Sequence, residues 1–143
     1  MSGGDETRAA GGGRALEELS DAECRQLLAG HHVGRLGVVI EGQPLVLPVN
    51  YVFDGARIAI RSDPGTKLTA STLAKVSFEI DGIDEESRGG WSVLVQGHAF
   101  DVTEALDEIS EMVRRLPVDP WASGDKAAWI RIEPRLITGR RLV

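Results

Sequence analysis

The spacing of apolar residues near the start of the chain predicts a helix over residues 20–30. Apolar side chains recur there at helical intervals around Cys24. Ser20, with Glu23 three residues later, forms a capping-box pattern, and Gly30 is a natural helix end. We therefore expect a short helix that turns Cys24 into the core.

From residue 32 onward the apolar period shortens to two, which is typical of β-strands. The turn at residues 41–43 and the Asp54-Gly55 pair predict two hairpins. Residues 81–90, DGIDEESRGG, are expected to form a loop. The predicted strands are VGRLGVVI (33–40), LVLPVNYVF (45–53), ARIAIRS (56–62), KVSFEI (75–80), WSVLVQGHAFDV (91–102), AWIRIEP (128–134) and LITGRRLV (136–143).

Two further helices interrupt or follow these strands. TKLTASTLA, residues 66–74, is expected to be a short helix, with Asp63 and Pro64 capping and opening its first turn or forming a turn ahead of it. EALDEISEMVRRL, residues 104–116, carries an apolar stripe at helical spacing, and Thr103 can cap it.

The number and order of these elements indicate a mainly β fold. Six or seven strands with hairpin turns and only two or three helices predict an antiparallel barrel or sandwich with helices at its ends. Residues 1–15 are glycine-rich with almost no large apolar side chain, so we expect a flexible tail. Residues 16–143 are long enough for one domain with its own core.

Composition narrows the classes of partner. The formal net charge of −6 argues against charge-driven binding to nucleic acid. No apolar run approaches the roughly 20 residues that span a bilayer, and the N-terminus lacks an apolar signal region. The single cysteine cannot form an internal disulfide. We therefore expect a cytoplasmic protein that acts on a small molecule, with no nucleic-acid or membrane partner.

Several catalytic patterns are missing from the sequence. There is no G-x-S-x-G motif, no Cys or His pair with zinc spacing, and no G-x-G-x-x-G fingerprint. No matched pair of acidic residues stands out as an acid and a base. The sequence therefore indicates no metal and no catalytic residue.

The segment RSDPGTKL, residues 61–68, gathers two cations and two hydroxyls around a Pro-Gly turn. Arg61 and Lys67 could neutralise a phosphate, while Ser62 and Thr66 could donate hydrogen bonds to its oxygens. Backbone N–H groups at a tight turn or helix N-terminus also attract anions. The alternative, a strand-to-helix connection whose cations face water, remains open at this point.

Residues 48–51, PVNY, form a second candidate. Pro48 within a strand favours an edge or a bulge, where backbone groups are free to bind a ligand. If this strand pairs with residues 56–62, the two strand ends would present a polar edge beside the phosphate clamp. Alternatively, Pro48 simply ends one strand and begins another.

Taken together, these segments resemble the pyridoxamine 5′-phosphate oxidase-like, FMN-binding split-barrel family. The similarity covers about residues 17–143 and lies in the order and spacing of the segments rather than in any one of them. The segments are GRLGVV, PVNY, IAIRSDPGTKL, VSFEID, WSVLVQGHA, PWASG and the ending W-I-R-I-x-P with I-T-G-R-R.

The resemblance implies a six-stranded antiparallel split barrel and a homodimer with flavin sites at its interface. It also implies an FMN-dependent oxidoreductase, in which the flavin carries the redox chemistry. Trp91 and Trp129 could instead fill the core or the interface. The residues carried over are Arg61, Ser62, Thr66 and Lys67 for the phosphate, Pro48, Val49, Asn50 and Tyr51 for the ring, and Trp91, Ser92, Trp129 and Arg140 as further contacts.

Other cofactors and a non-catalytic role stay open within this family. Its members include proteins similar to F420-dependent reductases and haem-degrading proteins, so F420 or haem is the alternative cofactor. The acidic residues 81–86 disfavour F420, and haem would need His98 as its axial ligand. No histidine follows His98, so we do not expect pyridoxamine phosphate as the substrate. A sensor or storage module that binds its ligand without turnover is the alternative function.

Overall fold

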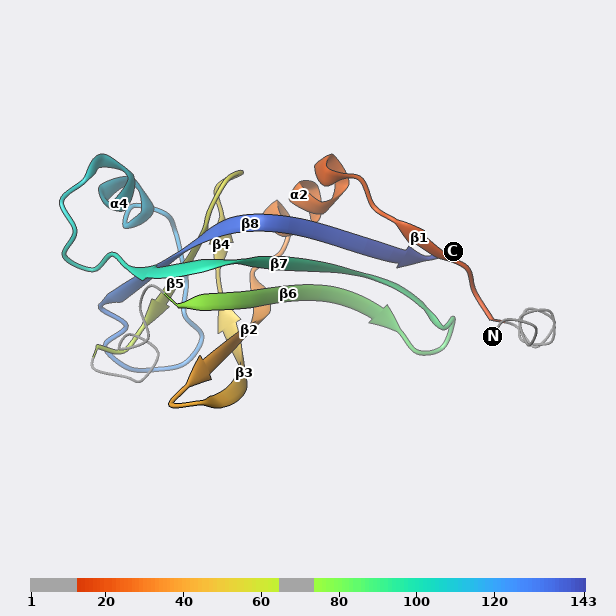
Figure 1. The fold of residues 1–143 in the computed structure, drawn as a ribbon, viewed down its shortest axis with the longest axis horizontal. Helices are drawn as coiled ribbons and strands as arrows, with labels where there is room; N and C mark the ends of the chain where they lie inside the picture. The colour runs from red at the N-terminus through yellow and green to blue at the C-terminus, as the bar shows by residue number, and fades with distance from the viewer. Residues whose placement is uncertain (1–12, 65–73) are drawn as a thin grey trace.

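The protein is described by a computed structural model covering residues 13–64 and 74–143. Figure 1 shows a long, curled antiparallel sheet with one short helix beside its middle and another at one end. The elements are β1 (Leu16–Glu18), α2 (Asp21–Ala29), β2 (Val33–Ile40), β3 (Gln43–Asn50), β4 (Val52–Phe53), β5 (Ile58–Ser62), β6 (Lys75–Asp84), β7 (Gly89–Asp101), α4 (Glu108–Val113) and β8 (Ala128–Leu142).

The strands form one sheet in the order β3-β2-β6-β7-β8-β5-β4, with β1 pairing to the far end of β8. Every neighbouring pair is antiparallel. Among the described residues, six strands have five residues or more, and β1 and β4 are shorter. The prediction of a mainly β, six-stranded antiparallel split barrel is confirmed, with two short strands added.

Local sequence signals explain the predicted turns and the first helix. Ser20 and Glu23 form the capping box of α2, and Cys24 is fully buried. The β2–β3 turn places Glu41 and Gly42 at positive φ, as a two-residue hairpin loop requires. These elements are short-range in origin, and the sequence predicted each of them.

The main core lies inside the curl of the sheet and is sealed by α2. Residue 139 of β8 must be glycine, because a Cβ there would lie 2.7 Å from the Cys24 sulfur. The Tyr51 ring is buried, and its hydroxyl donates a 2.7 Å hydrogen bond to the Leu28 carbonyl. Burial raises the pKa of the Tyr51 phenol. A smaller second core, under α4, consists of Ala59, Val102, Val113 and Val118.

Three strand predictions need correction. The two short strands expected at the C-terminus are one strand, β8, of 15 residues. Residues 81–90 are mostly strand, because β6 runs to Asp84 and β7 begins at Gly89. The strand β1 was not predicted; its partner lies at the other end of the chain, so no local pattern marks it.

The helix over residues 104–116 was also predicted too long. It spans only Glu108–Val113, and its N-cap is Asp107 rather than Thr103. The Thr103 hydroxyl instead accepts a hydrogen bond from the Trp129 amide, at 2.9 Å. The apolar stripe is only partly used, since Val113 is buried while Leu106 is 84% exposed.

The remaining predictions fall partly outside the described residues. Residues 66–73 of the helix expected after Asp63 lie there, and so do residues 1–12 of the expected tail. The last tail residue, Ala15, exchanges two backbone hydrogen bonds with Val143 beside the end of β8.

Candidate functional site

A cavity of about 250 Å³ lies where β3 and β5 end, at the same end of the molecule as α4. Strand residues form one wall, and the segment after α4 forms the other. The lining residues are Leu47, Pro48, Val49, Asn50, Ile60, Arg61, Ser62, Pro120, Ala122 and Lys126. Five residues predicted from the sequence, Pro48, Val49, Asn50, Arg61 and Ser62, therefore meet at one cavity.

Pro48 lies within β3, which is the edge strand of the sheet. The prediction of an edge position is therefore confirmed. The predicted strand 45–53 is divided into β3 and β4, and its pairing with β5 is confirmed only for Val52 and Phe53, because Pro48 pairs with Arg35 of β2. The ends of β3 and β5 therefore line the same cavity without pairing to each other through a hydrogen-bonded ladder.

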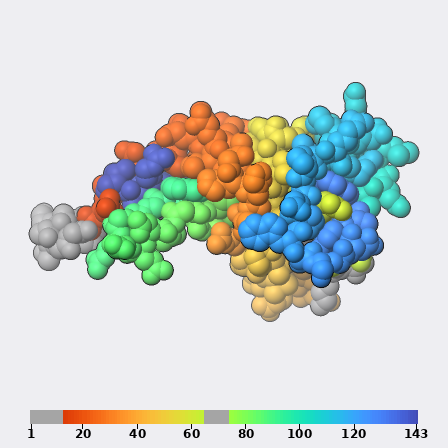
Figure 2. All heavy atoms as spheres, turned by 180° about the vertical axis from the view of Figure 1, so that it is seen from behind, coloured from red at the N-terminus to blue at the C-terminus, as the bar shows by residue number. Residues whose placement is uncertain are grey.

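Residues 117–127, here called the cover loop, form the outer wall of this cavity. In the space-filling view, the blue segment that follows α4 lies against the yellow-orange atoms of the strands (Figure 2). The Asn50 side-chain oxygen accepts a 2.8 Å hydrogen bond from the Trp121 amide. The Trp121 side chain itself is 75% exposed.

Arg61 attaches β5 to the cover loop. Its Nε donates to the Lys126 carbonyl at 3.0 Å, and its Nη1 donates to the Val118 carbonyl at 3.4 Å. The guanidinium also lies 5.3 Å from the ring centroid of Trp129, its cross-strand partner. Arg61 is thus held by neutral carbonyls and an aromatic ring, so its positive charge is not cancelled by these partners.

Asp63 holds the same loop by an ion pair. Its carboxylate lies 3.0 Å from the Lys126 Nζ and accepts a 3.1 Å hydrogen bond from the Lys126 amide. These contacts with Lys126 keep the pKa of Asp63 below its usual range. No sequence pattern indicated this long-range role of the Asp63 carboxylate; the helix that Asp63 was expected to cap, or to precede in a turn, lies outside the described residues except for Ala74.

Thr66 and Lys67, the other two residues of the predicted phosphate clamp, lie outside the described residues. Tyr51 lies beside the cavity strand but turns its ring into the core, against Phe78 at 4.8 Å between centroids. Only its backbone faces the neighbouring strand, where the Tyr51 amide donates to the His32 carbonyl.

The other predicted contacts form a second group near the opposite end of β7 and β8. Ser92 and Arg140 are cross-strand partners, and they share a hollow of about 250 Å³ with Trp91. The Trp91 ring packs 4.9 Å from the His31 ring and against the core. The Arg140 side chain is exposed, and its guanidinium makes no hydrogen bond or ion pair with any described residue.

The two groups are far apart within one chain. Trp129 and Arg140 are eleven positions apart on β8, which corresponds to roughly 35 Å of extended strand. Figure 1 shows the two ends of this strand on opposite sides of the molecule. One flavin mononucleotide cannot contact both groups of the same chain.

A perturbed carboxyl group lies on the open face of the sheet near the second group. Burial, followed by the neighbouring Asp81, raises the pKa of Glu79 to about 7. Arg35 lies 3.9 Å from Asp81 and partly offsets the effect. Asp81 is itself the cross-strand partner of Ser92.

The sequence interpretation missed the residues that build the cover loop onto the strands. These are the side chain of Asp63, which was assigned elsewhere, and Lys126. The prolines and glycine of residues 117–127 mark a loop but not its docking partners. Among residues 13–64 and 74–143, no helix could cross a membrane, and no group of three metal-ligating side chains occurs.

The curled antiparallel sheet is that of the flavin-binding split-barrel proteins. It matches the FAD binding protein from Mycobacterium smegmatis with a TM-score of 0.73 and 34% identity, covering 88% of this chain and 99% of that chain. A FAD-binding protein from Mesorhizobium loti matches with a TM-score of 0.71 and 28% identity, covering 90% and 99%.

The sequence comparisons identify the family. The sequence model of the pyridoxamine 5′-phosphate oxidase family matches residues 20–141, so the chain belongs to this family. The protein Rv0080 of Mycobacterium tuberculosis is 30% identical over 149 residues, covering 100% of this chain and 96% of the relative. The family resemblance that was inferred from the order and spacing of the sequence segments is thereby confirmed.

Proposed function

We propose that this protein is a flavin-dependent oxidoreductase that holds FMN in the cavity between β3, β5 and the cover loop. The observation that carries the proposal is the lining of that cavity. Arg61 brings positive charge to it that no carboxylate among its described partners cancels, and Ser62 brings a hydroxyl, within a chain of net charge −6. Lys126 lines it as well, but its charge is paired with a carboxylate. Thr66 and Lys67, which follow Ser62 closely in sequence, would add two further phosphate contacts.

The residues of the cavity would bind and orient the cofactor. Bound flavin supplies the redox chemistry. The edge strand β3 offers the backbone of Pro48, Val49 and Asn50 to the polar rim of the ring, because no strand of the described part of the chain pairs with its outer side. The Arg61 guanidinium is fixed by two carbonyls, so its orientation toward an anion costs little side-chain entropy.

The homodimer is part of the same proposal. Since the groups around Arg61 and Arg140 lie at opposite ends of β8, Trp91, Ser92 and Arg140 would complete the site of a second copy. Each dimer would then have two equivalent sites, as a two-fold axis requires. Exposed apolar side chains beside Arg140, Leu16 and Ile83, favour such an association.

The absorption spectrum of freshly purified protein tests the cofactor. We expect the bands of oxidised flavin; a deazaflavin spectrum or a Soret band would instead identify F420 or haem. Mass spectrometry of the released cofactor then distinguishes FMN from FAD. FAD is the main alternative, because two structures similar to this chain are FAD-binding proteins. A colourless protein that takes up neither flavin on titration would disprove the proposal.

A mixed dimer tests the shared site. Arg61→Ala and Arg140→Ala chains with different affinity tags are co-expressed, and the heterodimer is isolated by both tags. If each site uses Arg61 of one copy and Arg140 of the other, one site of the heterodimer is intact and the other has both defects. We expect one tightly bound flavin per heterodimer. Two equally weakened sites, or a monomer in sedimentation with flavin present, would contradict the dimeric site.

A second candidate function is a flavin-binding module without turnover. It is favoured by one observation: no carboxylate or histidine is among the described residues that line the cavity, so none is positioned there as a proton donor. Anaerobic mixing with NADPH, NADH or reduced F420 separates the two functions. Bleaching of the flavin bands and steady turnover with an acceptor support the oxidoreductase, whereas a spectrum that no donor changes supports the module.

A further inference from the structure

A second and larger cavity, of about 590 Å³, adjoins the candidate flavin cavity along the edge strand. Residues 47–50 of β3 line the first cavity, and residues 44–46 of the same strand line the second. Its other walls come from β2, β6, β7 and β8. None of the residues predicted from the sequence to bind FMN lines it; His98, the ligand that haem would need, does.

The cavity exists because β2 separates from β6. The two strands pair only through residues 35–37 and 77–79, and beyond Gly37 the β2–β3 hairpin continues without β6. Figure 1 shows this hairpin leaving the line of the long strands. The side chains of Val39, Pro44 and Val46, which share one face of the hairpin, then form an apolar wall that is open to solvent.

A β-bulge adds a cation to the opposite wall. The register of β7 and β8 shifts between Gln96 and Gly97, which pair with Leu136 and Pro134, so that Arg135 is left over as the extra residue. Gly97 permits the close approach, because a Cβ there would lie 2.2 Å from the Glu133 carbonyl oxygen. Bulges of this kind redirect a side chain, and Arg135 lines the cavity.

The ionisable side chains that line this cavity are all basic. They are Lys75, its cross-strand partner His98, and Arg135. No described lining residue carries a carboxylate, although the whole chain is acidic. The nearest carboxylate by register is Glu133, opposite His98.

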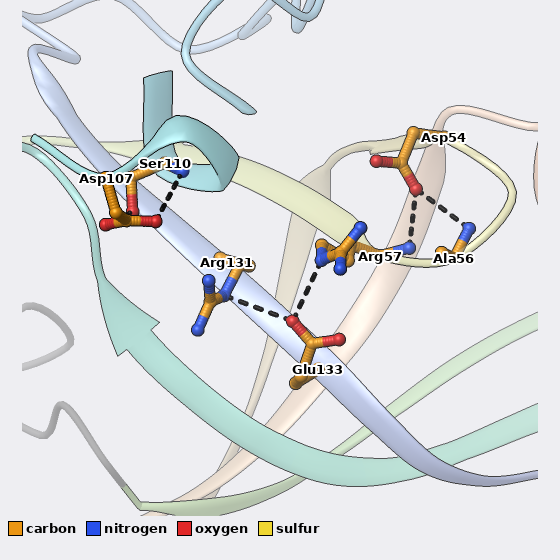
Figure 3. A network of polar contacts seen from close by, with 7 residues as sticks. All are labelled: Asp54, Ala56, Arg57, Asp107, Ser110, Arg131 and Glu133. Atoms are coloured by element: carbon orange, nitrogen blue, oxygen red, sulfur yellow. Dashed lines mark hydrogen bonds and ion pairs between the residues drawn. The ribbon is translucent and has the colours of Figure 1, made fainter. Parts of the chain in front are cut away.

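Glu133 is already neutralised by two arginines. Its Oε2 lies 3.0 Å from Nε of Arg57 and 3.3 Å from Nε of Arg131 (Figure 3). Its charge is therefore not available to offset those of Lys75 and Arg135. The cavity combines an apolar wall with a positive rim.

We propose that this cavity binds an amphipathic organic anion, with its apolar body against Val39, Pro44 and Val46 and its anionic group near Lys75, His98 and Arg135. Charge complementarity and the open apolar wall carry this assignment. The proposal does not depend on the flavin. A second copy of the chain covering the cavity is the competing occupant, and the experiment below distinguishes it.

Two fluorescent probes of nearly the same shape test the proposal on the full-length protein. Anilinonaphthalenesulfonate carries an anionic group, and N-phenylnaphthylamine is its neutral counterpart. We expect the sulfonate to bind the wild-type protein more tightly. Lys75→Gln and Arg135→Gln should each weaken the sulfonate about two- to fivefold, and the double variant about tenfold, because these cations are partly exposed. The neutral probe should change by less than about twofold.

Two further variants serve as controls. Arg115→Gln removes an exposed cation on the C-terminal side of α4 and should leave both probes unaffected. Val46→Asp should weaken both probes, since it alters the apolar wall. Thermal unfolding confirms that each variant is folded.

Three results would overturn the inference. The first is that neither probe binds the folded wild-type protein. The second is that both probes bind with equal affinity and that the glutamine variants change the affinity of neither. The third is that Val46→Asp turns a dimer into monomers in sedimentation and that the probes bind only the monomer. This result would show that a second copy of the chain occupies the cavity in the wild-type dimer.

Discussion

The two groups of predicted cofactor residues differ in how their polar side chains are held. Around the first cavity, Asn50, Arg61 and Asp63 are all bonded to the cover loop. At the other end of β8, Arg140 is exposed and has no polar partner among the described residues. The first group is preorganised within one chain, whereas the second lacks the contacts that would fix it.

This difference indicates separate kinds of contribution to a site. Side chains that tie a loop to a sheet determine the shape of a cavity, and removing them affects folding as well as binding. An exposed, unpartnered cation contributes little to folding and becomes important only when an anion or another chain reaches it. The following predictions test this contrast, from the largest effect to the smallest.

The largest effect on stability is expected for Arg61→Ala. The change removes two hydrogen bonds from a charged donor to the carbonyls of Lys126 and Val118, and the contact with Trp129. We expect the free energy of unfolding to fall by about 2–3 kcal/mol, measured by urea denaturation. Arg115→Ala, at an exposed position just after α4, is the matched control and should cost less than about 0.5 kcal/mol.

If Arg61→Ala were as stable as the control, the cover loop would not depend on this anchor. The first group would then be no more preorganised than the second. Flavin affinity measured on both variants shows whether the loop matters for binding independently of stability.

The next largest effect concerns Lys67, which lies outside the described residues and is predicted from the sequence to hold a phosphate. Lys67→Ala should weaken FMN by about 1.5–3 kcal/mol, or roughly ten- to a hundredfold in dissociation constant. Riboflavin has the same ring without the phosphate, so its affinity should hardly change. If fluorescence titrations show that Lys67→Ala weakens the binding of both ligands equally, or of neither, Lys67 does not bind the phosphate.

A smaller effect, with a pH dependence, is expected for Glu79→Gln on the open face. The Glu79 carboxyl has a raised pKa of about 7 in the folded chain, so the folded state binds its proton more tightly than the unfolded state does. This group therefore lowers stability progressively as the pH rises from about 4.5 to 7, and the loss persists above pH 7. The glutamine variant should be more stable than wild type by about 1 kcal/mol at pH 8, after allowance for solvent screening, and no more stable at pH 4.

Urea denaturation across this pH range measures the Glu79 effect. Glu85→Gln, in the exposed turn between β6 and β7, provides a control whose difference from wild type should not vary with pH. A Glu79→Gln difference that is constant from pH 4 to pH 8 would show that the carboxyl titrates normally in the folded state.

The sequence predicted best what is encoded by neighbouring residues. The hairpin at Asp54-Gly55 follows from a side chain that accepts hydrogen bonds from the amides of Ala56 and Arg57. The capping box of α2 is equally local. For the same reason, the candidate residues around Pro48 and Arg61 could be found from strand ends and turns.

What the sequence did not reveal depends on contacts between distant residues. Arg61 and Lys126 are 65 positions apart, and no periodicity predicts that one would hold the other. The joining of two expected strands into β8 results from continuous pairing with β7 across a bulge, which overrides Pro134 as a strand end. The cavity beside Arg135 depends on that same bulge, so it could not have been predicted.

The smallest effect on stability is expected for Arg140→Ala. Its guanidinium has no polar partner among the described residues, so the free energy of unfolding should stay within about 0.5 kcal/mol of wild type. If Arg140 contributes to the site of a second copy, flavin affinity should nevertheless fall about fivefold, as for an exposed cation near an anion. Arg88→Ala, an exposed cation in the turn that joins β6 to β7, should change neither quantity. If the flavin affinity of Arg140→Ala is unchanged, Arg140 is not part of the site. If Arg140→Ala loses as much stability as Arg61→Ala, the two ends of β8 do not differ in how their side chains are held.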